Sequence, residues 1–230
     1  GTTFHHKEKH SQKYVTDPYY SSIHLPFFML KNKILLLFLF SCLQDVCLAQ
    51  QKLNVVIAGL SHDHVNGMLQ KANSGRLLIS GIAEPDAALC KRMKAAHNLP
   101  DSIFYPTLAA ALIKNKPDLV MVYNAPADHL AAVATCMPLN IPVMFEKPFS
   151  FSYADALKMK QLSEKHHTNV YTNYPSLWYT SFTELLKRVN EKNELDTITK
   201  MEMHGGHIGP AEIGCSKDFL SWLASPVKNG

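Results

Sequence analysis

The sequence predicts an α/β protein with a Rossmann-type parallel sheet, followed by the start of a second α+β domain with a largely antiparallel sheet. Three observations support the parallel sheet. Apolar runs alternate with amphipathic stretches after residue 52. The runs are continuously apolar, which is typical of strands buried on both faces of a parallel sheet. The first run, Leu53–Ala58, ends at Gly59 and a helical pattern follows, as in a dinucleotide-binding unit.

The elements follow in a regular order along the chain. We expect strands over residues 53–58, 77–83, 119–123, 141–145 and 169–171. We expect helices over residues 64–72, 87–96, 107–114, 127–137 and 152–166. Strands separated by helices indicate βαβ crossovers, and such sheets bind ligands beyond the carboxyl ends of their strands. Beyond a helix ending near Val189, apolar and polar residues alternate over residues 197–204, which predicts one strand of the second sheet.

The composition excludes several functional classes. With 230 residues, 47% hydrophobic and 18% charged, the chain has ordinary globular composition. Its net charge is +4, but residues 1–52 hold six lysines against three acidic residues. No basic stripe remains after that segment, so nucleic acid is not expected as a partner. Cys90, Cys136 and Cys215 are widely spaced without a C-x-x-C motif, which predicts neither a zinc site nor a disulfide framework.

The first fifty residues have the pattern of a leader. Residues 1–28 are polar and form a predicted upstream segment outside any domain. Residues 29–49 combine a basic start, the apolar run 34–40 and a small-residue exit at Ala49, which predicts a signal peptide and an exported, periplasmic or secreted protein. The run is shorter than the ~18 residues of a membrane span. A lipoprotein cleavage box at residues 39–42 and a buried N-terminal helix or strand are the alternatives.

Gly59 and Glu84 are the first candidates for cofactor binding, in a domain predicted over residues 50–172. Glycine allows a tight turn, and the following helix would point unpaired N–H groups at a pyrophosphate. Glu84 ends the second strand 25 residues later, close to the ~20 expected for a ribose-binding acid. A carboxylate there accepts hydrogen bonds from ribose hydroxyls and repels a 2′-phosphate, so NAD is favoured over NADP. A solvated Glu84-Pro85-Asp86 turn is the alternative.

Two more polar segments follow strands at the same predicted edge. Residues 124–129 follow one strand and Glu146-Lys147-Pro148 follows the next; a helix-capping turn and a salt-bridged surface turn are the alternatives. With Gly59 and Glu84, in this order and spacing, they resemble the glucose–fructose oxidoreductase / inositol dehydrogenase (Gfo/Idh/MocA) family. The resemblance runs from about Leu53 to the C-terminus, and the E-K-P tripeptide is its most specific part.

The resemblance implies roles for these residues. It assigns Lys147 to the catalytic centre, beside the nicotinamide and the reacting sugar carbon, where an ammonium group polarises a carbonyl and relays a proton. Glu146 would contact the nicotinamide side of the cofactor or orient Lys147. The cofactor-binding residues that the resemblance implies lie in strand-end loops: Gly59, Leu60, Ser61, His62, Glu84, Asn124, Pro126, His129, Glu146 and Lys147.

The chain also departs from the family pattern. Ser61 and His64 replace the second and third small residues of the glycine fingerprint, so we expect a weakened or rearranged phosphate loop. Family members carry a glycine-rich segment and Asp-x-x-x-His in the second domain, and the chain stops before such a segment. We therefore expect residues 173–230 to be a truncated substrate and oligomerisation domain, and the full-length protein to be a homo-oligomer.

Some second-domain residues are candidates for substrate contact. Asn173, Tyr174, His204 and His207 would face a sugar, although packing explains the aromatic residue equally well. Two histidine pairs, His62 with His64 and His204 with His207, invite a metal hypothesis. Neither has a third ligand at a recognised spacing, so we expect no metal site.

The sequence leads to three functional hypotheses. The first is an NAD-dependent oxidoreductase that transfers hydride between the nicotinamide and a sugar or cyclitol derivative. The second is an NAD-dependent, redox-neutral glycoside hydrolase with the same site. The third is an inactive sugar- or nucleotide-binding relative. Net NADH formation separates the first from the second.

Overall fold

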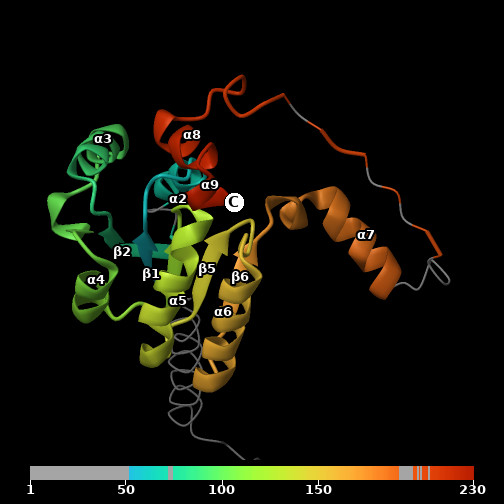
Figure 1. The fold of residues 1–230 in the computed structure, drawn as a ribbon, viewed down its shortest axis with the longest axis horizontal. Coiled ribbons are helices and arrows are strands. Elements are labelled where there is room, and N and C mark those ends of the chain that lie inside the picture. The colour runs from blue at the N-terminus through green and yellow to red at the C-terminus, as the bar shows by residue number, and fades with distance from the viewer. Residues whose placement is uncertain (1–51, 72–74, 192–198, 201, 203, 207) are drawn as a thin grey trace, which may run out of the picture. The chain divides into compact units, whose positions relative to one another are not determined.

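The computed structural model describes residues 52–230 apart from 72–74, 192–198, 201, 203 and 207 (Figure 1). These residues all belong to one compact unit, 51–230. The predicted upstream segment and signal peptide lie outside the described residues. Within the described ranges, no helix has the length and apolar character to cross a bilayer.

Six parallel strands form the sheet, in the order β3-β2-β1-β4-β5-β6. Their bounds are β1 Leu53–Ala58, β2 Leu77–Ala83, β3 Phe104–Tyr105, β4 Leu119–Val122, β5 Val143–Glu146 and β6 Val170–Asn173. The strand order reverses between β1 and β4, which is the switch point where Rossmann sheets bind dinucleotides. The predicted Rossmann-type sheet is confirmed. β3 was not predicted, because a strand of two residues is too short to produce an apolar run.

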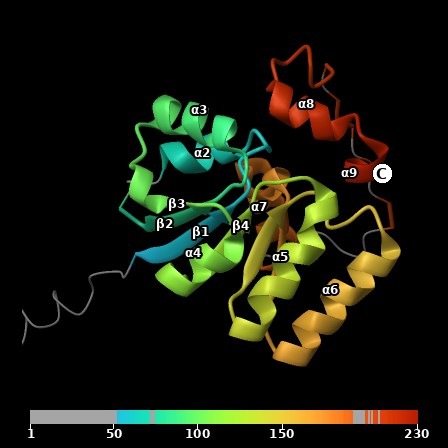
Figure 2. The same ribbon diagram turned by 60° about the vertical axis from the view of Figure 1, so that its left-hand side comes forward.

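Helices cover both faces of this sheet (Figure 2). Their bounds are α2 Val65–Gln70, α3 Ala87–His97, α4 Leu108–Asn115, α5 His129–Cys136 and α6 Tyr153–His166. Val56 and Ala58 of β1 belong to a core with α4, α5 and α6. Val55 and Ile57 belong to a second core with α2 and α3. Because successive strand residues point to opposite faces, burial on both sides requires the continuous apolar runs of the sequence.

Polar side chains fix where three of the helices on the sheet begin. Asp86 accepts hydrogen bonds from the backbone N–H groups of Ala88 and Leu89 at the start of α3. Thr107 and Ser152 cap α4 and α6 in the same way. Such caps satisfy donors that have no partner inside a helix, and they favour the starts of α3, α4 and α6 at these residues.

The chain after β6 contains short helices: the 3₁₀ turn η4 Pro175–Trp178, α7 Thr180–Asn190, α8 Lys217–Leu223 and α9 Pro226–Asn229. The antiparallel strand predicted over residues 197–204 is not confirmed. Its described residues 199, 200, 202 and 204 lie in no strand, and the others are outside the described residues. A strand without a hydrogen-bonded neighbour leaves its backbone groups unpaired, and the described ranges offer this segment no partner strand.

Candidate functional site

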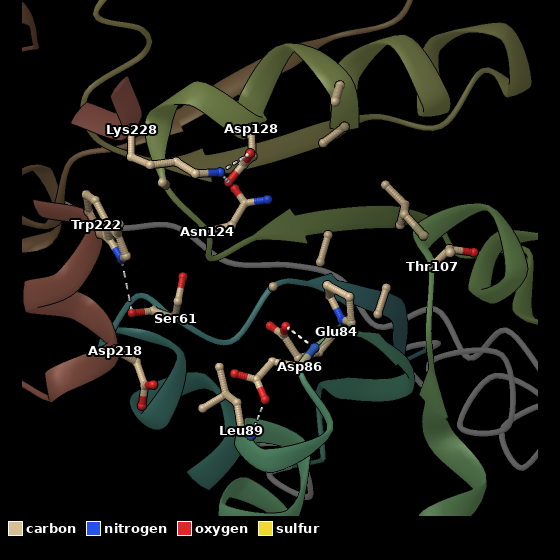
Figure 3. A pocket seen from close by; sticks show the side chains of 18 of the residues that line it. Ser61, Glu84, Asp86, Leu89, Thr107, Asn124, Asp128, Asp218, Trp222 and Lys228 are labelled. Atoms are coloured by element: carbon tan, nitrogen blue, oxygen red, sulfur yellow. Dashed lines mark hydrogen bonds and ion pairs between the residues drawn. The ribbon is translucent and has the colours of Figure 1, made fainter. Parts of the chain in front are cut away.

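A cavity of about 610 Å³ lies beyond the carboxyl ends of β1, β2 and β4 (Figure 3). It brings together Gly59, Ser61, Glu84 and Asn124, which the sequence predicted as cofactor contacts. The unpredicted residues in its lining include Asp86, Thr107, Ala125, Asp128, Asp218, Trp222 and Lys228. Its position at the switch point and its size are those of a small-molecule or cofactor site.

Gly59 makes the turn that opens this cavity. Its φ is +82°, and a Cβ placed on it would lie 2.7 Å from the Cβ of Asn124. Its N–H donates a 2.8 Å hydrogen bond to the carbonyl of Ala83. The loop after β1 therefore lies against the end of β4 in a backbone conformation that favours glycine, and any side chain would force the two apart.

Glu84 holds the same loop from the other side. Its Oε2 accepts a 2.9 Å hydrogen bond from the backbone N–H of Leu60, and its Oε1 accepts one from the N–H of Asp86. Only 9% of the residue is exposed. Burial raises the pKa of Glu84, and the two backbone hydrogen bonds offset part of that rise. The carboxylate thus has a structural role that the spacing argument did not reveal.

The loop after Gly59 directs few donors toward a ligand. The N–H of Leu60 is bound to Glu84, and the N–H of His62 donates to the carbonyl of Tyr123 at 2.9 Å. The Ser61 side chain points into the cavity (Figure 3). Across from it, the Oδ1 of Asn124 is buried and has no hydrogen bond within the described chain. A ligand hydroxyl could donate to Asn124 Oδ1, and a ligand phosphate could accept from the Ser61 hydroxyl, so the residues fit a nucleotide.

Helices α8 and α9 form one wall of the cavity. Trp222 donates from Nε1 to the carbonyl of Ser61 at 3.2 Å, and Lys228 lies 3.1 Å from Asp128 (Figure 3). Outside the cavity wall, Ser216 N–H donates to Asp63 at 2.6 Å. No motif marked these residues in the sequence, because their role depends on a chain segment returning over the sheet edge from far along the chain.

Six of the predicted cofactor contacts do not line the cavity: Leu60, His62, Pro126, His129, Glu146 and Lys147. His129 is 1% exposed, its ring stacks on Phe145 with centroids 4.3 Å apart, and its Nδ1 lies 3.2 Å from the carbonyl of Phe149. Burial lowers the pKa of His129, which favours the neutral form of its ring. Pro126 is also buried, in the 3₁₀ turn before α5. The structure gives both residues packing contacts, since the turn after β4 directs them into the core.

A second group of polar side chains lies at the ends of β1 and β5. His64 Nδ1 is 3.0 Å from Glu146 Oε2, and Asn173 donates from Nδ2 to Glu146 Oε1 at 2.7 Å. His62 and Glu146 are each 2% exposed. Burial lowers the pKa of His62 to about 4. Burial alone would raise the pKa of Glu146, but contacts with His64 and Asn173 outweigh it and lower the value.

The other candidates are placed at or near the surface. Lys147 follows β5 and is exposed at the same sheet edge, outside the cavity lining. Tyr174 and His204 are exposed, and His207 is outside the described residues. Asn173, predicted as a sugar contact, instead orients Glu146 and accepts a 3.0 Å hydrogen bond from Trp178 Nε1.

Comparison with known families identifies the domain. Residues 53–174, more than half of the chain, match the family described as "Oxidoreductase family, NAD-binding Rossmann fold". The protein belongs to the Gfo/Idh/MocA family. This match covers the whole six-stranded sheet, so the strand ends that border the cavity belong to a family NAD-binding domain, while the wall made by α8 and α9 lies outside the matched residues. Comparison with curated protein sequences gives no match.

Solved structures with the same fold include three dehydrogenases. WlbA dehydrogenase from Bordetella pertussis, in complex with NADH and UDP-GlcNAcA, has a TM-score of 0.53 and 13% identity over 61% of this chain and 42% of that chain. Apo scyllo-inositol dehydrogenase from Lactobacillus casei has a TM-score of 0.53 and 12% identity over 64% of this chain and 43% of that chain. Myo-inositol 2-dehydrogenase from Lactobacillus plantarum has a TM-score of 0.52 and 14% identity over 62% of this chain and 42% of that chain. The chain thus spans less than half the length of these proteins, and the likeness shows the fold.

Proposed function

We propose that this chain is the cofactor-binding part of an NAD-dependent oxidoreductase that acts on a sugar or cyclitol derivative. One observation carries the proposal: in a domain of the Gfo/Idh/MocA family, the cavity at the switch point gathers Gly59, Glu84 and Asn124. Sugar and inositol dehydrogenases with the same fold support the substrate class.

The cavity residues divide the contacts to the cofactor. Glu84 accepts hydrogen bonds from ribose hydroxyls with the lone pairs that its two backbone contacts leave free. Its negative charge disfavours the 2′-phosphate of NADP. Ser61 donates its hydroxyl to a phosphate oxygen, in place of the family's glycine. When bound, the nicotinamide supplies the hydride acceptor or donor.

Lys147 is the proposed catalytic residue. As an ammonium group it donates a hydrogen bond to the substrate oxygen and supplies a proton when the carbonyl is reduced; as a neutral amine it accepts the hydroxyl proton when the alcohol is oxidised. Its exposure at the end of β5 leaves it open to a substrate. Residues 173–230 belong, in this proposal, to a second domain that supplies the substrate wall and the contacts of a homo-oligomer, in a protein exported after cleavage of its signal peptide.

Calorimetric titration of the chain with NAD⁺ and NADP⁺ tests the cofactor. We expect NAD⁺ to bind at least ~10-fold more tightly, because a 2′-phosphate beside Glu84 costs about 1.4 kcal/mol or more. Equal affinities, or no binding of either, contradict the proposal. In the complete protein, NADH absorbance with a panel of sugars and cyclitols tests the reaction, and Lys147→Met should abolish turnover while leaving NAD⁺ affinity within about 3-fold. Release of an aglycone without net formation of NADH would contradict net hydride transfer and support the redox-neutral glycoside hydrolase instead.

A further inference from the structure

A set of metal-ligating side chains lies beside, and not within, the nucleotide cavity. His62 and His64 follow β1, and Glu146 ends β5. Each offers one ligand atom, and the three atoms all lie within 4.8 Å of one another. The sequence supplied the histidine pair but not the third ligand, which comes from 82 residues further along the chain.

One buried atom in this set, His62 Nε2, has no hydrogen bond within the described chain. Glu146 Oε2 is also buried, and its neighbour is His64 Nδ1 at 3.0 Å. Unsatisfied polar atoms are rare in native interiors and indicate an absent water or ion. One carboxylate and two neutral imidazoles close to one another are chemically suited to bind a cation.

We propose that His62, His64 and Glu146 bind one divalent transition-metal ion of the zinc type. Two imidazoles and one carboxylate are an established donor set for zinc sites that keep an open position. A tetrahedral ion about 2.1 Å from each ligand separates the ligand atoms by about 3.4 Å. The 3.0 Å pair lies about 0.4 Å inside this spacing, and side-chain movements of up to about 1.4 Å (4.8 − 3.4) bring in the third ligand.

The surroundings hold these ligands in place. Asn173 fixes the other carboxylate oxygen of Glu146, and Trp178 in turn fixes Asn173. Such outer contacts orient metal ligands. His62 Nδ1 accepts a long 3.3 Å hydrogen bond from the N–H of His64. Metal at Nε2 requires the ring proton at Nδ1, so this hydrogen bond is lost when the ion binds. The side chain of His64 is 47% exposed, which leaves access for the ion and room for a water or substrate oxygen.

Zinc titration of the metal-stripped chain tests the site. The background chain carries His5→Asn, His6→Asn and His10→Asn, since histidines so close in sequence bind zinc without a fold. We expect one Zn²⁺ per chain by calorimetry, and a visible d–d spectrum of low-symmetry Co²⁺ when cobalt replaces zinc. No NAD or sugar is present, so this result is independent of the proposed function.

Substitutions of the ligands locate the ion. Glu146→Gln and His64→Asn should each weaken Zn²⁺ binding at least ~10-fold and remove the cobalt spectrum, and Asn173→Ala should weaken binding by about 10-fold. His167→Asn, at an exposed residue after α6 with φ +50°, is the matched control and should change nothing. Circular dichroism checks that each variant is folded. His64→Asn is the variant least expected to disturb folding, because the side chain of His64 is half-exposed. Absence of stoichiometric binding, or equal binding by Glu146→Gln and the control, overturns the proposal.

Discussion

Asn124 occupies the space that a side chain on Gly59 would need. The distance from its Cβ to a Cβ built on Gly59 is 2.7 Å, and its backbone N is 3.1 Å away. The two residues lie just beyond the ends of the adjacent strands β1 and β4, and both line the cavity. The loop can only keep its course if residue 59 has no side chain.

Gly59→Ala should therefore destabilise the domain and weaken NAD⁺ binding. Strain at positive φ together with displacement of β4 should lower the free energy of unfolding by about 2 kcal/mol or more. Urea denaturation measures this. Gly75→Ala is the matched control, because its φ is +86° but a Cβ there meets nothing within 4 Å, so it should cost only about 1 kcal/mol. Equal losses in both variants would contradict the steric argument.

Glu84→Ala should weaken NAD⁺ binding by about 10- to 100-fold, since it removes the ribose acceptor and leaves the Leu60 N–H without its partner. Glu84→Gln should lose less, because one oxygen remains to accept a hydrogen bond. Isothermal titration at fixed salt gives both values. An affinity of Glu84→Ala equal to that of the wild type would show that the acid is a turn residue only.

The same carboxylate should make NAD⁺ affinity depend on pH. Burial raises the pKa of Glu84 above its usual 4.5, so protonation begins at a higher pH than for an exposed glutamate. Protonation converts an acceptor into a donor, and affinity should fall as pH is lowered through that range. Glu84→Gln should show a flatter profile as the pH is lowered from neutrality toward the raised pKa of Glu84. Parallel profiles for the two proteins would assign the titration to another group.

Trp222 should report nucleotide binding. It is 7% exposed and lines the cavity, whereas Trp178 is 71% exposed and lies beside Asn173. In a Trp178→Phe chain, NAD⁺ should quench or shift the remaining emission. In Trp222→Phe the response should be lost while calorimetric binding persists. A response that depends instead on Trp178 would place the ligand elsewhere.

His129 should make stability fall in acid. Its folded-state pKa is lowered by burial, so below the unfolded value of about 6.5 the unfolded chain binds the extra proton. Its contribution is fully present above that pH and is lost as pH falls, by up to about 1.4 kcal/mol per pH unit. His129→Gln should reduce the slope of unfolding free energy against pH by one proton. An unchanged slope would mean that His129 is not held neutral.

The strands of the sheet and the helices on its faces were largely predictable, since burial on both faces imposes continuous apolar runs such as Leu53–Ala58. The two-residue strand Phe104–Tyr105 was not predictable, because it has no periodic pattern. The strand predicted over residues 197–204 is the opposite case, a pattern without the element. Alternation of apolar and polar residues does not by itself provide a neighbouring strand to pair with.

The sequence by itself determined that Gly59, Glu84 and Asn124 meet at one sheet edge, because parallel strands all end on the same side. Tertiary structure alone decided that His129 turns into the core and that Trp222 and Lys228 wall the cavity. It also decided that Glu146 lies against His64. These relationships depend on the helix direction after each strand and on the order of strands in the sheet. Spacing along the chain records neither.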